Sequence, residues 1–128
     1  MTVLWLSTEN VMSIHQRSLA DHGGAEGVRD PGLLESALEK PKQRFFYSEP
    51  SIYELATAYA SGIVKNHAFV DGNKRTAFLT AYVFLGVNGY ELDAEEAEAA
   101  AITLDLAASK VTEDDYAKWL EINCAPVE

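Results

Sequence analysis

Cysteine, basic charge and long apolar runs are all scarce in this sequence of 128 residues. Cys124 is the only cysteine, so no disulfide can form within the chain, and a reducing cytoplasm is the expected environment. No apolar run is long enough to span a bilayer. The first residues also lack the basic region and the apolar length of a secretory signal. We therefore expect a cytoplasmic protein that has no membrane partner.

Basic residues are outnumbered, with 10 Lys and Arg against 20 Asp and Glu, for a net charge of −10. This balance argues against direct binding of nucleic acid, which needs clustered Lys and Arg. Much of the acid lies at residues 93–98 and 113–115, where it suits the first turns of helices. Three cations gather elsewhere, at Lys65, Lys74 and Arg75. A cationic pocket in an anionic protein suits a nucleotide.

The length and the 48% hydrophobic content are typical of one globular domain, here residues 1–128. Helical periodicity and helix start signals predict about six helices, with at most a short extended piece at residues 90–92. We therefore expect an all-α fold, a compact bundle of helices around a buried central helix.

Start and stop signals define the first two predicted helices. The first spans about residues 8–21, and it includes His15, which we interpret as a surface or partly packed histidine. Asp30 followed by Pro31 is a strong signal for the start of the second helix. Pro41 is expected to end that helix, because proline disfavours a helix interior.

Residues 43–50 have no clear periodicity, and we interpret them as an aromatic loop. Phe45, Phe46 and Tyr47 have two interpretations. They either cover the core or form a flap that holds a peptide or a nucleotide base.

Two further segments have clear helical signals. Ser51 and Glu54 form a capping box, and the helix that they open carries an apolar stripe as far as His67. Residues 77–87 are apolar on every face, which is typical of a buried helix, so we expect this helix to be the central one. Asn88 and the glycine after it supply the stop.

The ten residues 67–76 combine the groups that phosphate chemistry needs. His67 is a base that is mostly neutral near pH 7, and Asp71 is a hard oxygen ligand suited to Mg²⁺. Gly72 lets the backbone approach a ligand closely. Asn73 is expected to cap a helix whose free N–H groups and positive dipole end favour an anion.

Lys74 and Arg75 add two cations at the same helix end, and Lys65 lies nearby in the sequence. Each residue alone has a simpler explanation, such as a turn before a helix or a solvated charge. No further His or Cys accompanies them, so the pattern does not favour zinc. The combination favours a site for phosphoryl or nucleotidyl transfer.

This stretch resembles the signature of the Fic/Doc family, His-x-Phe-x-Asp/Glu-Gly-Asn-Gly/Lys-Arg. The matching residues are His67, Phe69, Asp71, Gly72, Asn73, Lys74 and Arg75. Residues 23–24, 27–30 and 33–37 also resemble the N-terminal part of the Doc (death-on-curing) branch. The resemblance implies the Fido fold over most of the chain.

The resemblance also implies roles for these residues. His67 would be the general base that takes a proton from a target hydroxyl, and Asp71 would hold Mg²⁺ on the phosphates of ATP. The backbone and side chains of residues 72–75, with Lys65 near them, would bind the phosphates. Phe69 would pack inward and hold the loop.

Two departures from the signature favour the Doc branch. Typical Fic enzymes move AMP from ATP to a protein hydroxyl, with a second Gly after the Asn and another Arg three residues beyond the first. This chain has Lys74 and Phe78 at those places. Doc resembles a kinase in activity: it binds ATP in the reversed sense and phosphorylates elongation factor Tu on a threonine, which stops protein synthesis.

The resemblance therefore implies a toxin controlled by a Phd-like antitoxin, a small protein whose C-terminal segment folds onto the toxin. Residues 109–114 only approach the internal inhibitory motif of some Fic proteins, so inhibition is expected from a separate chain. The first helix and Phe45, Phe46 and Tyr47 are the candidates to line the antitoxin groove. Two alternatives remain open: transfer of AMP or another nucleotide through the same site, and a catalytically silent Fido-fold binding module.

Overall fold

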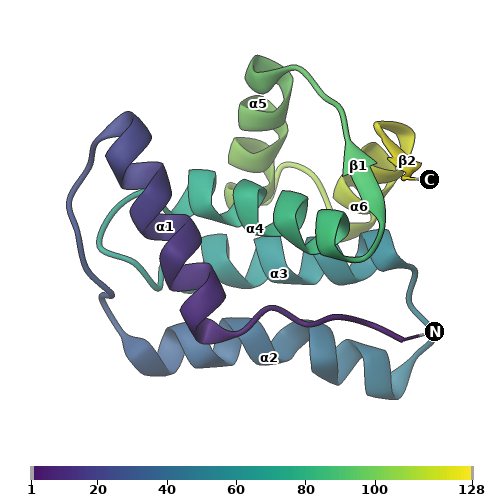
Figure 1. Cartoon of the computed structure of the whole chain (residues 1–128), viewed down its shortest axis with the longest axis horizontal. Coiled ribbons are helices and arrows are strands. Elements are labelled where there is room, and N and C mark those ends of the chain that lie inside the picture. The colour runs from purple at the N-terminus through teal and green to yellow at the C-terminus, as the bar shows by residue number, and fades with distance from the viewer. Residues whose placement is uncertain (1, 128) are drawn as a thin grey trace.

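The computed structural model describes residues 2–127, which fold into six helices and two short strands (Figure 1). In chain order these are α1 (Thr8–His22), α2 (Pro31–Tyr47), α3 (Ile52–Asn66), α4 (Asn73–Val87), β1 (Tyr90–Leu92), α5 (Glu96–Ala107), α6 (Glu113–Ile122) and β2 (Cys124–Pro126). The predicted all-α class and the number of helices are confirmed. Within residues 2–127, no helix has both the length and the apolar character that crossing a membrane requires.

Local side chains define where the helices begin. Three helices open with a capping box, in which two side chains each accept a hydrogen bond from the other residue's backbone: Ser7 with Asn10, Ser51 with Glu54, and Thr112 with Asp115. At the start of α2, the Asp30 carboxylate accepts hydrogen bonds from the N–H groups of Gly32 and Leu33. Each cap satisfies donors that the first helical turn leaves free and is worth about 1 kcal/mol.

Helix α3 lies at the centre of the fold, packed against α2, α4 and α6. Every residue from Leu55 to Val64 is buried. The prediction that the next helix is buried on all sides is wrong. Helix α4 packs on α3 but leaves Tyr82 and Val87 43% and 45% exposed. Its apolar outer face is therefore a surface available to a ligand or a partner.

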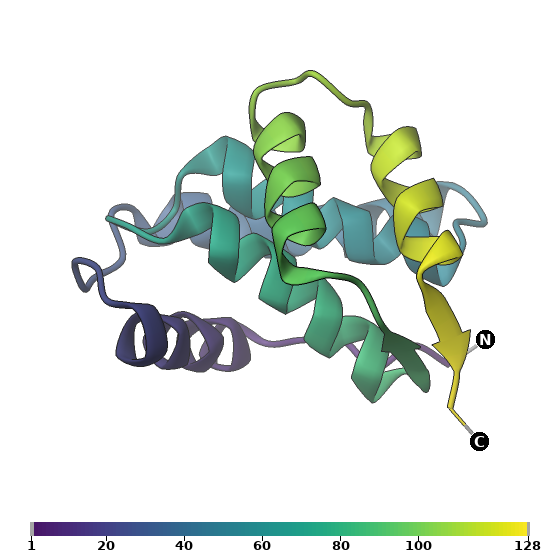
Figure 2. The same ribbon diagram turned by 90° about the horizontal axis from the view of Figure 1, so that it is seen from above.

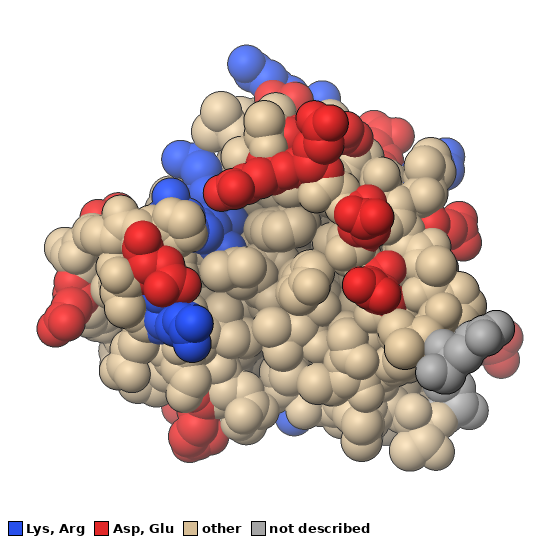
Figure 3. Space-filling model, turned by 45° about the horizontal axis from the view of Figure 1, so that its top comes forward, with Lys and Arg blue, Asp and Glu red and all other residues tan. Residues whose placement is uncertain are grey.

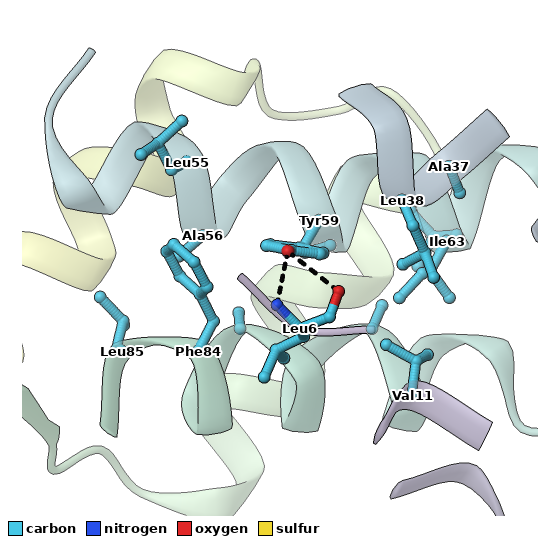
Figure 4. Close-up of a cluster of buried hydrophobic side chains, with 14 of the residues drawn as sticks. Leu6, Val11, Ala37, Leu38, Leu55, Ala56, Tyr59, Ile63, Phe84 and Leu85 are labelled. Atoms are coloured by element: carbon cyan, nitrogen blue, oxygen red, sulfur yellow. Dashed lines mark hydrogen bonds between the residues drawn. The ribbon is translucent and has the colours of Figure 1, made fainter. Parts of the chain in front are cut away.

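The N-terminal segment is fixed to the core through Tyr59 of α3, which is fully buried (Figure 4). The Tyr59 hydroxyl accepts a hydrogen bond from the N–H of Leu6 at 3.0 Å and donates one to the Leu6 carbonyl at 3.4 Å. Burial raises the pKa of Tyr59 to about 12, so the hydroxyl stays protonated. This contact fixes the chain just before α1, and so it helps to set where α1 lies.

Helix α2 is longer than the sequence predicted, because it continues through Pro41 to Tyr47. A proline inside a helix costs about 3 kcal/mol, and here Pro41 is buried. The expected aromatic loop is therefore the last turn of α2. Phe45 packs edge-on against Trp5, with ring centroids 5.5 Å apart, which agrees with a role in covering the core.

Strands β1 and β2 pair in antiparallel register, with Tyr90 opposite Pro126 and Leu92 opposite Cys124. The extended piece at residues 90–92 was predicted, whereas its partner strand was not. The pairing brings the end of the chain beside the segment that follows α4 (Figure 2).

The close approach of α2 and α3 depends on Gly62. A Cβ atom at Gly62 would lie 2.8 Å from the carbonyl oxygen of Ala37 and 3.1 Å from its Cα. We expect Gly62→Ala to lower the free energy of unfolding by about 1–3 kcal/mol through over-packing, measured by urea denaturation. Gly86→Ala is the matched control, since a Cβ there meets nothing within 4 Å. It should be neutral or stabilise by up to about 1 kcal/mol, and equal losses in both variants would contradict the packing argument.

Candidate active site

Residues 67–75, called the motif from here on, form the connection between α3 and α4 and the start of α4. They lie beside the loop that joins α1 to α2 (Figure 1). His67 ends α3 in the left-handed conformation, with φ 49° and ψ 50°, and its side chain is exposed. A residue with a side chain adopts this conformation only when its surroundings impose it. The contacts around His67 therefore impose its conformation.

Arg29, from the loop before α2, holds this turn. Its guanidinium donates hydrogen bonds to the carbonyl oxygens of His67 at 2.7 Å and Asn66 at 3.0 Å. Its backbone N–H donates to the carbonyl of Ala68 at 2.8 Å. A cation on carbonyls that α3 leaves free is favoured by both hydrogen bonding and the helix dipole. Sequence reasoning gave Arg29 no role in the site.

The loop between α1 and α2 runs along the motif as a short antiparallel pair. Val28 forms a β-bridge with Phe69, and the N–H of Val70 donates to the carbonyl of Gly27 at 3.0 Å. Gly24 lies close to the Asp71 side chain. The φ of Gly24 is 126°, and a Cβ there would lie 3.0 Å from Oδ2 of Asp71. Only glycine combines this backbone conformation with this contact.

The Asp71 carboxylate is held by backbone N–H groups at both oxygens. Ala25 donates to Oδ2 at 3.1 Å, and Gly72 donates to Oδ1 at 2.8 Å. These two hydrogen bonds lower the pKa of Asp71, and the bond from Ala25 has the larger effect. The nearby His15 and Arg75 lower this pKa further. The carboxylate is exposed, and its oxygens keep lone pairs for a cation.

Asp71 fits a magnesium ion that is also bound by substrate. Within residues 2–127, no three His, Cys, Asp or Glu side chains are grouped as ligands for a metal. A site with one carboxylate cannot enclose a metal by itself. Magnesium at phosphate sites is commonly bound by one or two carboxylates, with waters and substrate phosphates completing its shell.

The prediction that Asn73 caps α4 is wrong. The N-cap is Gly72, and Asn73 is the first helical residue. The Asn73 side chain bonds back to Phe69 instead: Oδ1 accepts from the Phe69 N–H at 3.0 Å, and Nδ2 donates to the Phe69 carbonyl at 2.9 Å. No side chain of residues 2–127 caps α4, so its first N–H groups and its dipole remain available to an anion.

Lys74 and Arg75 line a cavity of about 440 Å³ between the end of α1, α4 and α5. Its walls are mainly apolar and include Phe78, Leu79 and Leu104. The volume lies in the range of about 300–1,000 Å³ that is usual for small-molecule sites. A helix N-terminus with two cations therefore adjoins an apolar cavity.

Not every predicted site residue joins this arrangement. Phe69 is buried beneath the motif, 1% exposed, as expected. The Lys65 amine donates to Ser109 instead, in a hollow between α3 and the α5–α6 connection that includes no motif residue. Phe46 and Tyr47 are 81% and 90% exposed at the end of α2. The C-terminal end of α2 is about 24 Å along the helix axis from Pro31, which lies at the end of α2 near the motif. Phe46 and Tyr47 therefore cannot form a flap over the motif.

The sequence of this chain is similar to those of known proteins. A family model described as Fic/DOC family matches residues 5–85, which include α1 to α3, most of α4 and the whole motif. The protein kinase doc of Escherichia phage P1 is 29% identical over 116 residues, which are 90% of this chain and 91% of that protein. The Toxin Doc of Mycolicibacterium smegmatis is 41% identical over 75 residues, which are 57% of this chain and 58% of that protein.

The lowered pKa of Asp71 predicts a specific response to acid. A carboxyl whose pKa is lower in the folded state stabilises the fold above its unfolded pKa, and this contribution is lost as pH falls through the folded pKa. We expect Asp71→Asn to flatten the dependence of the unfolding free energy on pH below about pH 4. Carbon-13 NMR titration of the parent should also give Asp71 a pKa below its ordinary value. An ordinary pKa would contradict the two backbone hydrogen bonds.

Proposed function

The chain belongs to the Fic/DOC family, and we propose that it is a Doc-like toxin that transfers a phosphate from Mg²⁺-ATP to a protein hydroxyl. One observation carries the proposal: an exposed histidine, a carboxylate open to a cation and an uncapped helix N-terminus meet in one connection. The names of the two relatives, a protein kinase and a toxin, support the two parts of the proposal. Elongation factor Tu is the proposed target, because the resemblance to Doc implies it.

The proposed reaction is a direct displacement at the γ-phosphorus. The hydroxyl oxygen of the target forms a bond to this phosphorus, and the bond from phosphorus to the bridging oxygen breaks, so that ADP leaves with the electron pair. His67 takes the hydroxyl proton as the bond forms. Its exposed position at the edge of the site suits a base that must reach a side chain of another protein.

Phosphoryl transfer also requires that the negative charge of the phosphates is compensated. Magnesium, when bound at Asp71, neutralises charge on the phosphates. The N–H groups at the start of α4 bind phosphate oxygens, together with the side chains of Lys74 and Arg75. Such fixed donors and cations stabilise the charge that develops in phosphoryl transfer. Arg29 and Gly24 hold the turn in which these groups lie.

Phe78 supports phosphoryl transfer over AMP transfer. The Fic signature has an arginine at this place, whereas Phe78 lines the apolar cavity next to Lys74 and Arg75. An apolar wall suits a nucleoside and not a phosphate. Phe78, Lys74 and Arg75 would hold a nucleotide with its nucleoside in this cavity and its phosphates at the cations.

We propose that the antitoxin binds the apolar outer face of α4. Val83 and Val87 line a hollow with Leu4 and with Ile14 of α1, and Tyr82 is exposed next to them on the same helix. Figure 3 shows an uncharged face bordered mainly by acidic residues, with Lys and Arg along one side. An amphipathic segment that folds on binding needs such a groove. Of the two candidate surfaces that the sequence suggested, only the first helix contributes to it.

Replacement of the base tests the reaction directly. Intact-mass analysis of elongation factor Tu, incubated with this protein, Mg²⁺ and ATP, should show a gain of phosphate. His67→Ala should reduce the rate by about 10²–10⁴-fold or more without loss of folding, because the side chain is exposed. Lys65→Ala, two residues earlier, should keep most of the transfer, since its amine bonds to Ser109.

The other outcomes of this measurement are equally informative. A gain of AMP would make the chain a nucleotidyl transferase. Absence of any mass change, together with absence of nucleotide binding, would make it a binding module. Near-normal transfer by His67→Ala would remove His67 from the mechanism.

Growth experiments test the toxin and its control. Expression of the chain alone in a bacterium should arrest growth, and co-expression of the neighbouring small open reading frame should restore growth and yield a co-purifying pair. Val87→Asp should keep the toxicity but lose the rescue, because a charge would enter the apolar hollow. Val127→Asp, at a position 56% exposed and outside that hollow, is the matched control. Harmless expression of the intact chain would contradict the toxin assignment.

A further inference from the structure

A second histidine lies directly beneath the motif, although it is not part of it. His15 of α1 is 3% exposed, so the expectation of a surface or partly packed histidine is wrong. Its Nε2 lies 2.8 Å from the backbone carbonyl oxygen of Asp71. Its ring is stacked on Phe69, with centroids 3.9 Å apart and planes 12° from parallel.

These contacts define the chemical role of the His15 ring. A carbonyl oxygen can only accept a hydrogen bond, so Nε2 must carry the proton and donate. The stack on Phe69 fixes the plane of the ring and therefore the direction of this donor. A Cβ at Gly72 would lie 3.8 Å from Nε2, so the ring lies against the Asp71–Gly72 peptide itself.

Asp71 is thereby anchored at three atoms. His15 holds its carbonyl oxygen, Gly72 holds Oδ1, and Ala25 holds Oδ2. The carbonyl carbon and the side chain leave the same Cα, so a fixed peptide plane limits where the carboxylate can point. Because Asp71 is the only carboxylate of the motif, its direction decides whether a cation can bind there at all.

The core fixes the part of α1 that carries His15. Val11 lies one turn earlier on the same face of α1 and is fully buried in the core. The Leu6–Tyr59 hydrogen bonds fix the chain just before α1. Helix α1 therefore carries the geometry of the core into the connection between α3 and α4.

We propose that His15 is a positioning residue that orients Asp71 for binding of a divalent cation and the phosphates bound to it. This inference rests on the proposed nucleotide site. Residues that orient metal ligands through hydrogen bonds typically change metal affinity by about 10–100-fold when replaced. The same order is expected here, because His15 acts on the one protein ligand of the cation.

Three variants separate this role from simple packing. His15→Phe keeps a flat ring on Phe69 but removes the donor. His15→Gln keeps a donor but removes the ring. Val11→Ala removes buried volume from the same face of α1 and leaves the His15 ring and its hydrogen-bond donor unchanged, so it reports the effect of loosening this helix. Thermal unfolding of all three gives the loss of stability against which the other measurements are compared.

Two readouts are used, and neither depends on turnover. The first is binding of Mn²⁺, alone and with a non-hydrolysable ATP analogue, followed by electron paramagnetic resonance. The second is hydrogen exchange at the backbone amides of Ala25 and Gly72, whose N–H groups hold the Asp71 carboxylate. The exchange readout remains valid if the parent binds no nucleotide, a result that would refute the proposed function alone.

His15→Phe should weaken binding of the Mn²⁺-nucleotide complex by about tenfold or more and speed exchange at Ala25 and Gly72. His15→Gln should recover part of both effects. Val11→Ala should lower the melting temperature and change neither. The proposal would be overturned if His15→Phe showed the same exchange and binding as the parent. It would also be overturned if the effects of His15→Phe on exchange and binding were no larger than those of Val11→Ala at equal destabilisation.

Discussion

The hydrogen bonds that join the α1–α2 loop to the α3–α4 connection are the constraint on which the site depends. Gly27 and Arg29 pair with the motif through the backbone, the Arg29 side chain covers the end of α3, and the Ala25 N–H holds Asp71. A connection of this length would otherwise sample many conformations. These bonds select the one in which His67 is exposed and the start of α4 is uncapped.

This arrangement gives a protein with a net charge of −10 a local site that is suited to an anion. The uncapped N–H groups and the dipole of α4 give a local positive potential, which Lys74 and Arg75 strengthen. Much of the acid lies elsewhere, in the first turns of α5 and α6. Local geometry, rather than total charge, therefore decides what the site attracts.

The fold class was predictable from the sequence, because it depends on short-range signals. Capping boxes and helical periodicity identified the helices, and the residue types from 67 to 75 are the basis of the proposed phosphate chemistry. The remaining features depend on tertiary contacts. His15 has an ordinary helical context until the fold stacks it on Phe69. Asn73 suits a cap until Phe69 offers its side chain two better partners, and Pro41 ends no helix, because its burial in the fold outweighs its local cost.

The central claim is that the terminal phosphate of ATP, and no other part of the nucleotide, is transferred to a target hydroxyl. It is tested most directly by parallel reactions with elongation factor Tu and Mg²⁺, using ATP labelled on the γ-phosphate in one and on the α-phosphate in the other. The account predicts that the label reaches the target from the γ-position only. Transfer of the α-label, or transfer of neither label by protein that binds the nucleotide, would contradict it.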